Sequence, residues 1–292
     1  MISARDFLIR GLLAGLVAGF LTFGVAYAAG EPSIGTAISL EDAAAHVHPM
    51  AMSGTEVPRD LQSTLGLLTG TTLIGTVLGA LAGIVTALVL GRLGRASTRA
   101  TALRVAATGF VVLYAVPFLI YPPNPPGVGS PDTLAHRTTL YFGMVAISVA
   151  AAVVAALAAH SLQNRIGAWY AALISIGGYG LAMVVALALM PRYNEVSATF
   201  PAQLLFEFRI GSLITQLALW TTIGLVLAEL VHRLVSPSKS AAAIQGQRPA
   251  PRPSSSTATT RSPRPASGTD SPAASTAPSI NQLVTALTAH LT

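Results

Sequence analysis

The sequence predicts an all-α fold: a polytopic transmembrane helical bundle of about six spans, with both termini in the cytoplasm. Three observations support this fold class. Of the 292 residues, 52% are hydrophobic and only 10% are charged, whereas a soluble domain usually carries about 25% charged residues. Apolar stretches near the length of a membrane span recur along the chain, and the arginines lie mostly between and after them. Because so little charge cannot cover a water-exposed globule, most of the surface is expected to face lipid.

Six stretches are long enough to cross a bilayer. A hydrocarbon core of roughly 30 Å requires about 20 apolar residues at the rise of an α-helix. Helices are expected because hydrocarbon offers no water to pair with backbone N–H and C=O groups. The predicted spans are residues 7–29, 65–90, 103–121, 139–161, 169–190 and 211–231. Together they define a transmembrane domain over residues 1–235.

The distribution of basic residues predicts the orientation. When the N-terminus is placed in the cytoplasm, most of the 17 Lys and Arg residues fall on the cytoplasmic side. The exceptions are Arg59, Arg137, Arg192 and Arg209. Long segments follow the positive-inside rule poorly, but the excess stays on the same side when the tail after Arg233 is left out.

The first span has a second interpretation. Its basic start, its apolar run and the small-residue motif Ala26–Ala28 also fit a cleaved signal peptide. The apolar run is longer than a typical signal-peptide core, and Gly11, Gly15 and Gly19 have the spacing of a close helix-packing face. We expect the segment to remain as a span. Cleavage would leave the orientation of the later spans unchanged.

Glycines recur in two later spans. Those between residues 66 and 83 predict packing faces on the second span. Those at residues 177–180 belong either to an ordinary helix of the bundle or to a broken helix beside a transport path.

Beyond residue 235 the composition changes. Residues 236–279 are rich in Pro, Ser, Thr and Arg and are predicted to be disordered, because they cannot bury a core. Residues 280–292 carry apolar residues at helical spacing. This end either forms a short amphipathic helix against a membrane or partner, or is a frayed terminus.

The segment between the first two spans holds a candidate metal-binding motif, since residues 46–52 read HVHPMAM. In an extended chain, alternate side chains face one way, which would align His46, His48, Met50 and Met52. The proline at position 49 favours extended geometry in the residue before it. Imidazole suits divalent metals such as cobalt, nickel, copper or zinc, while a thioether favours copper(I). The alternative is chance clustering in an ordinary loop.

Further polar residues lie where the other outer segments meet the spans. The proline-rich residues 121–129 cannot be helical and are expected to form a stiff cap. Ionisable groups inside a span are costly and tend to mark a pathway or an ion pair. The candidates for a pathway or entry site are Asp132, His136, Asn194, Glu195, Glu207 and Gln216. Simpler roles compete with these: a solvated boundary residue, an interface anchor for Glu207 and Arg209, or a bond to a neighbouring helix for Gln216.

The predicted outer side is also acidic. By this topology it holds every Asp and Glu except Asp6, Glu229 and Asp270. Acidic loops raise the local concentration of cations, although acidic residues also simply tolerate the outer face.

Several of these segments resemble the CbtA family. Residues 121–142, YPPNPPGVGSPDTLAHRTTLYF, resemble the signature of that family, as do shorter stretches at residues 62–63, 167–169, 194–201 and 208–220. The resemblance covers roughly residues 1–235. It implies a subunit of a predicted cobalt transporter with five or six spans, paired with CbtB, a small single-span membrane protein. Members commonly have a histidine-rich first outer loop, which here is reduced to His46 and His48 with the two methionines.

The expected function is therefore that of a multi-pass subunit in the cytoplasmic membrane that moves a divalent metal, most simply cobalt, and needs no bound cofactor. The chain has no GxxxxGK[ST] motif, so it does not hydrolyse ATP with a P-loop. A copper-handling protein, favoured by the thioethers, and a non-transporting scaffold, favoured by the few polar groups in the spans, are the alternatives.

Two other classes of protein are not expected. An enzyme would need an activated acid, base or nucleophile in the bundle, but the sequence has no HExxH, no GxSxG and no paired carboxylates within its spans. A nucleic-acid binder is not expected either, because the net charge of +6 follows the pattern of membrane topology.

Overall fold

The computed structural model describes residues 3–47, 57–92, 96–193 and 195–235, and over these residues it confirms an all-helical fold. Six helical segments are long and apolar enough to cross a membrane. They are Ala4–Ala29, Arg59–Val89, Thr98–Ile120, Leu134–Ile166, Ala168–Leu189 and Ala202–Val235. Each contains one predicted stretch to within one residue, and most extend further. The predicted tail, residues 236–292, lies outside the described residues.

The first, fourth, fifth and sixth segments are single helices: α1 (Ala4–Ala29), α7 (Leu134–Ile166), α8 (Ala168–Leu189) and α9 (Ala202–Val235). The second joins α3 (Arg59–Leu61), a π-helical turn η1 (Gln62–Gly66) and α4 (Leu67–Val89). The third joins α5 (Thr98–Phe110), a second π-helical turn η2 (Val111–Ala115) and α6 (Val116–Ile120). A further helix, α2 (Glu31–Val47), follows α1, and a short 3-10 turn, η3 (Pro131–Thr133), precedes α7.

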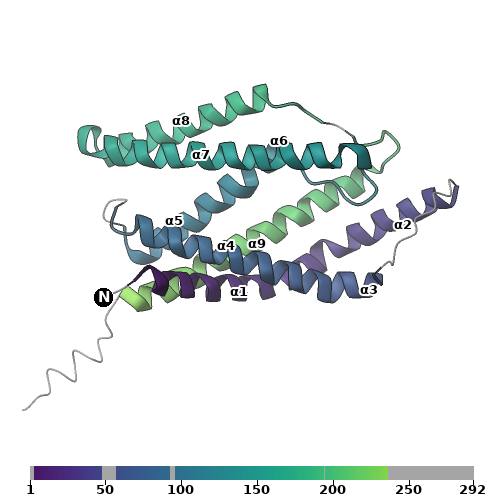
Figure 1. The fold of residues 1–292 in the computed structure, drawn as a ribbon, viewed down its shortest axis with the longest axis horizontal. Coiled ribbons are helices and arrows are strands. Elements are labelled where there is room, and N and C mark those ends of the chain that lie inside the picture. The colour runs from purple at the N-terminus through teal and green to yellow at the C-terminus, as the bar shows by residue number, and fades with distance from the viewer. Residues whose placement is uncertain (1–2, 48–56, 93–95, 194, 236–292) are drawn as a thin grey trace, which may run out of the picture. The chain divides into compact units, whose positions relative to one another are not determined.

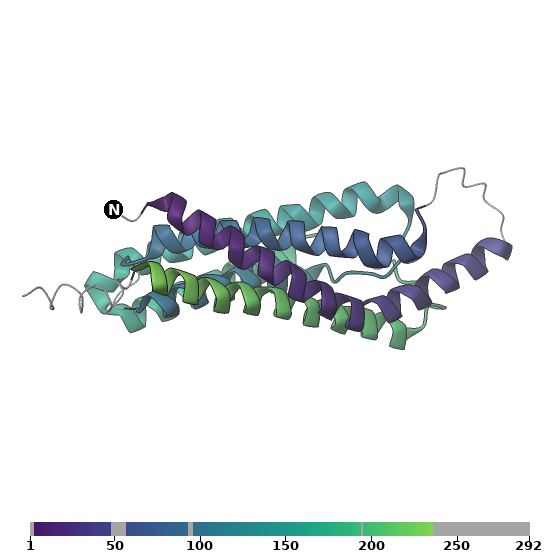
Figure 2. The same ribbon diagram turned by 90° about the horizontal axis from the view of Figure 1, so that it is seen from below.

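The tightest packing lies where α1 runs along α4 (Figures 1 and 2). A Cβ atom added to Gly75 would lie 2.7 Å from the carbonyl oxygen of Gly15, and one added to Gly79 would lie 2.5 Å from the Cα of Gly15. Only glycine allows backbones to approach so closely. By contrast, a Cβ at Gly70 would meet nothing within 4 Å. The packing face predicted on the second span therefore involves its later glycines and not Gly70.

The helix α9 completes this group by packing on α1 and α5. Its Leu219, Ile223 and Leu227 are buried together with Ala14 and Ala18 of α1. Because α1 supplies part of the main apolar core, the structure favours the spanning interpretation of the first segment.

Residues 31–47 form a helix, although a loop was expected from the sequence between the first two spans. Proline is well accommodated in the first turn of a helix, as at Pro32, and alanine, which dominates residues 43–45, has the highest helix propensity. The helix α2 packs on α9, burying Ser33 and Ala37, and projects beyond the other helices at this end (Figures 1 and 2). The expected extended display is therefore wrong at its first position, since His46 lies in α2.

The third span changes neighbours along its length, because α5 packs on α9 whereas η2 and α6 pack on α7. Pro117 explains the wide turn between them: it lacks an N–H, and its ring crowds the carbonyl one turn earlier. The N–H of Val116 bonds the carbonyl of Val111, five residues back. The carbonyl of Val112 thereby loses both helical donors, since Val116 is used and Pro117 has none. The buried Ser148 of α7 donates to it instead, at 2.8 Å.

The helices α7 and α8 form a hairpin joined at Gly167, whose φ of +84° favours glycine. The hairpin contacts the rest of the bundle through η2 and α6. The helix α8 is continuous through residues 177–180, so the structure shows an ordinary helix and not the broken-helix alternative. A Cβ on any of its three glycines there would meet nothing within 4 Å.

The bundle has two chemically different ends. At the proximal end, where α1 begins, Arg10 Nε donates to the carbonyl of Leu230 at 3.2 Å, so the end of α9 lies beside the start of α1. There Glu229 accepts hydrogen bonds from Arg99 and Arg233, at 2.7 Å each. The distal end holds the connections after α1, α6 and α8 (Figure 1).

Candidate functional site

A pocket of about 420 Å³, here called the distal pocket, lies among α6, the start of α7, the first half of α9 and the loops at the distal end. Aromatic side chains make up much of its wall. They are Tyr114, Phe118, Tyr121, Tyr141 and Tyr193. Three charged side chains also line it: Arg137, Glu195 and Arg209.

The proline-rich loop forms part of the pocket lining and is not helical, as the sequence predicted. Gly127 and Gly129 have φ values of +75° and +106°, which glycine adopts readily. A Cβ on Gly129 would lie 2.5 Å from Nη1 of Arg137. The missing side chain therefore leaves room for the Arg137 guanidinium beneath the loop.

Arg137 and Glu195 form an ion pair, with 3.3 Å between Nε and Oε2. The backbone N–H of Ser130 also donates to the Glu195 carboxylate, at 3.0 Å. A hydrogen bond from the Thr133 hydroxyl, the Ser130 N–H and the charge of Arg137 together hold the pKa of Glu195 below its usual value, while burial opposes them. Glu195 therefore stays ionised near neutral pH and balances the charge of Arg137.

Arg209 is held differently, because it binds neutral oxygens. Its Nε donates to the carbonyl of Pro123 at 3.4 Å, and its Nη2 donates to Oδ1 of Asn124 at 3.1 Å. Within the described part of the chain, Arg209 has no carboxylate within ion-pair distance. The predicted neighbour Glu207 is exposed and accepts from Gln203 at 2.9 Å instead. The distal pocket thus carries two arginines and one carboxylate.

Hydroxyl groups lie deeper along the same helices. The hydroxyls of Tyr114 and Ser212 are 3.0 Å apart, and both line the pocket. Gln216, one turn further along α9, is half-buried, and its amide makes no hydrogen bond to another described residue. A separate polar chain joins three spans, because Ser148 bonds both the carbonyl of Val112 and the hydroxyl of Tyr179, the latter at 2.9 Å.

The remaining predicted entry residues are scattered. His136 is exposed, with its ring 5.5 Å from that of Tyr193 in an edge-on contact beside the pocket. Asp132 is exposed in η3. Asn194, His48, Met50 and Met52 lie outside the described residues. Among the described members of the predicted set, Glu195 alone lines the distal pocket.

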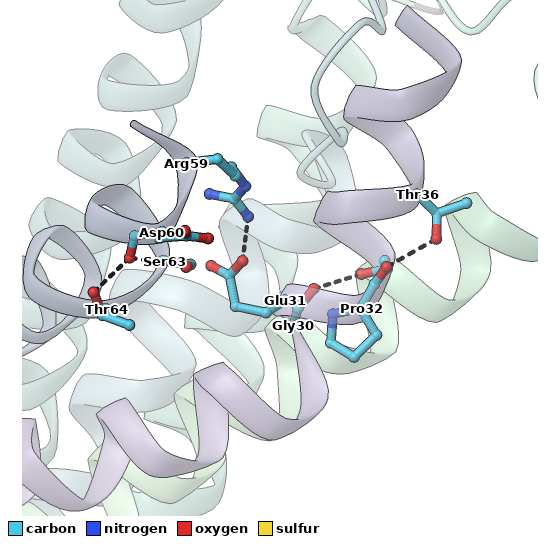
Figure 3. A network of polar contacts seen from close by, with 9 residues as sticks. Gly30, Glu31, Pro32, Thr36, Arg59, Asp60, Ser63 and Thr64 are labelled. Carbon is cyan, nitrogen blue, oxygen red and sulfur yellow. Dashed lines mark hydrogen bonds and ion pairs between the residues drawn. The ribbon is translucent and has the colours of Figure 1, made fainter. Parts of the chain in front are cut away.

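Some of the acidic residues at the distal end make structural contacts. Glu31, at the start of α2, forms an ion pair with Arg59 of α3 (Figure 3). Glu41 lies against the proline-rich loop, 3.2 Å from the position that a Cβ on Gly127 would occupy. In the described part of the chain, no group of three or more His, Asp or Glu side chains is arranged to hold a metal ion.

Arg137 and Arg209 meet in one pocket with Tyr114 and Ser212, and this was not predicted from the sequence. The two arginines lie in segments that resemble the CbtA family, but their spacing along the chain gives no signal that they converge. Pro117 was the available signal that the third span is not a regular α-helix throughout, and α6, which contains it, packs on α7.

Comparison with known proteins identifies a family that the chain matches. The chain matches the CbtA family, described as a probable cobalt transporter subunit, over residues 4–232. No curated protein and no solved structure matches it. The match covers nearly all of the six apolar helical segments and the whole distal pocket, so the polytopic membrane fold and the family agree. The chain belongs to the CbtA family of probable cobalt transporter subunits.

Proposed function

We propose that this protein is the subunit that moves cobalt ions across the cytoplasmic membrane, working with a small CbtB-like membrane partner. The observation that carries the proposal is the family match, which extends across the six apolar helical segments. The excess of arginine at the proximal end supports a cytoplasmic position for that end, and therefore an outward position for the distal end.

The proposed first contact with the metal is at residues 46–52. Positions 42 and 46 are four apart in α2, so Asp42 and His46 occupy the same face of the helix. Imidazole nitrogen suits cobalt, and nearby carboxylates raise the local concentration of cations. His48 and the thioethers of Met50 and Met52 would complete a capture site that follows the end of α2.

A partner chain would supply metal ligands, of which these spans contain few. The buried polar side chains within the described spans are hydroxyls, such as those of Ser148 and Thr86, which bond backbone carbonyls of the bundle. A dehydrated divalent cation prefers imidazole or carboxylate ligands. This supports a pathway formed between subunits.

The test is uptake of radiolabelled cobalt into cobalt-starved cells that express the chain alone or with the partner. Replacing both His46 and His48 with Ala should lower uptake about tenfold, since even indirect partners of metal ligands contribute roughly 10–100-fold to metal affinity. His160→Ala is the matched control, because His160 is an exposed histidine at the proximal end of α7. No uptake by properly inserted protein in either setting would contradict the proposal.

Copper handling is the second candidate, favoured by the two thioethers. Competition separates the two, since excess nickel should compete with cobalt at an imidazole site, whereas copper(I) should compete best at a Met-rich one. Replacing Met50 and Met52 with Leu should then affect copper uptake selectively.

A further inference from the structure

We propose that the distal pocket is a binding site for a small organic carboxylate, with Arg209 as its anchoring cation. This proposal goes beyond metal transport and does not rest on it. It concerns a ligand of opposite charge and a different set of residues from His46, His48, Met50 and Met52.

The charge of the pocket selects an anion. Glu195 neutralises Arg137 at 3.3 Å, whereas Arg209 has no carboxylate partner among the described residues. The lining therefore carries one uncompensated positive charge in a partly enclosed space, where charges interact more strongly than in water. A bare divalent cation would be repelled there, and a carboxylate would be attracted.

The donors are also arranged for a carboxylate. A guanidinium has five N–H donors in a planar fork, and Arg209 uses Nε and Nη2 on Pro123 and Asn124. Its Nη1 group has no partner among the described residues. Ser212 is three residues from Arg209, so both lie on the same face of α9. Because only one hydroxyl hydrogen is used between Ser212 and Tyr114, the other remains for a ligand.

The rest of the lining suits a carbon skeleton. Tyr and Phe rings from η2, α6, the start of the proline-rich loop, α7 and the loop before α9 line the space. Its volume of about 420 Å³ lies within the range of roughly 300–1,000 Å³ typical of small-molecule sites. Aromatic walls with a few fixed polar groups favour an organic acid over an inorganic ion.

Arg209 is held in place before any ligand arrives. The two oxygens that orient it belong to the proline-rich loop, whose prolines fix the backbone. A pre-positioned donor loses little conformational freedom on binding, and this raises affinity. The two contacts with the loop use Nε and Nη2 of Arg209. They leave the Nη1 group available to a ligand.

The experiment uses the full chain in nanodiscs of zwitterionic phosphatidylcholine, without metal, titrated calorimetrically with acetate, succinate and citrate. At least one of these should bind saturably. Arg209→Gln should weaken that binding about tenfold or more. Arg192→Gln, which removes the same charge from an exposed position at the same end outside the pocket lining, should leave it unchanged. Ser212→Ala, a milder change, should weaken it severalfold and serves if Arg209→Gln does not fold.

Three outcomes would overturn the proposal. The first is no binding of any of the three acids by folded wild-type protein. The second is binding that neither Arg209→Gln nor Ser212→Ala alters. The third is binding that disappears when the discs contain phosphatidylglycerol, because a lipid headgroup would then be the occupant. Since none of these measurements involves cobalt uptake, a failure here is distinguishable from a failure of the proposed transport function.

Discussion

Ser148 shows at the scale of one residue how this bundle satisfies a polar group within the membrane. Its hydroxyl is fully buried and bonds the carbonyl that the π-helical turn and Pro117 leave without a helical donor. It also bonds the Tyr179 hydroxyl, so one side chain ties together three spans. In hydrocarbon no water is available to donate a hydrogen bond to an unsatisfied carbonyl. The serine is therefore expected to contribute to stability.

Replacing Ser148 with Ala should destabilise the bundle by about 0.6–2 kcal/mol, the range from measured interhelical bonds in membrane proteins to the cost of an unsatisfied buried group. The measurement is unfolding of the purified protein in mixed detergent, followed by circular dichroism. Ser161→Ala is the control, because Ser161 is exposed near the end of the same helix. Equal effects of the two changes would contradict this account.

At the scale of elements, two features set the architecture: the α1–α4 pair and the π-helical turn in the third span. Glycines bring the backbones of α1 and α4 into direct contact, while the third span packs on α9 through α5 and on α7 through η2 and α6. The first feature was predictable from small-residue spacing. The second feature was not predictable from the sequence, because it depends on contacts between spans. The Val112 carbonyl lacks a helical donor beside Pro117, and Ser148 of α7 donates to it.

Replacing Gly79 with Ala should destabilise the α1–α4 pair by about 1–3 kcal/mol, the usual cost of overpacking, because the new methyl group would lie 2.5 Å from the Cα of Gly15. Gly70→Ala is the matched control in the same helix, with nothing within 4 Å of the added atom. It should be neutral or slightly stabilising, since alanine has the higher helix propensity. Melting temperatures of the two purified variants decide the point, and a melting temperature for Gly79→Ala no lower than that of Gly70→Ala would be inconsistent with tight packing.

At the scale of the whole described bundle, the contrast between its ends matters most. The proximal end gathers arginines, some of them paired with Glu229, and the distal end holds the pocket, the proline-rich loop and helix α2. An even number of spans places the start of α1 and the end of α9 together, as the bond from Arg10 to Leu230 shows. The positive-inside rule then predicts that the proximal end lies in the cytoplasm.

Cysteine labelling tests this orientation cleanly, because the chain contains no cysteine of its own. Ser39→Cys, exposed on α2, should react with a membrane-impermeant maleimide in intact cells. Asn164→Cys, exposed near the end of α7, should react only after the cells are permeabilised. The reverse pattern would invert the topology and place the distal pocket in the cytoplasm.

The sequence by itself determined the helical class, the six apolar stretches and the non-helical proline-rich loop, because the length and polarity of these segments are properties of the local chain. It also identified Glu195 as a site candidate. It did not determine that residues 31–47 are helical. The helix propensity of the alanines there acts together with tertiary packing, since α2 contacts α9 and its Ser33 and Ala37 are buried.

Only the tertiary structure decided which polar groups meet. Arg137, Glu195 and Arg209 come from three parts of the chain and meet in one pocket, where the loop leaves space for Arg137 at Gly129. Among the described residues, the structure also distinguished an arginine with a carboxylate partner, Arg137, from one without, Arg209, and this set the net charge of the pocket lining. The length and polarity of a local segment determine whether it can span the membrane. Whether a binding site carries a net positive or negative charge depends on distances between segments, and packing sets those distances.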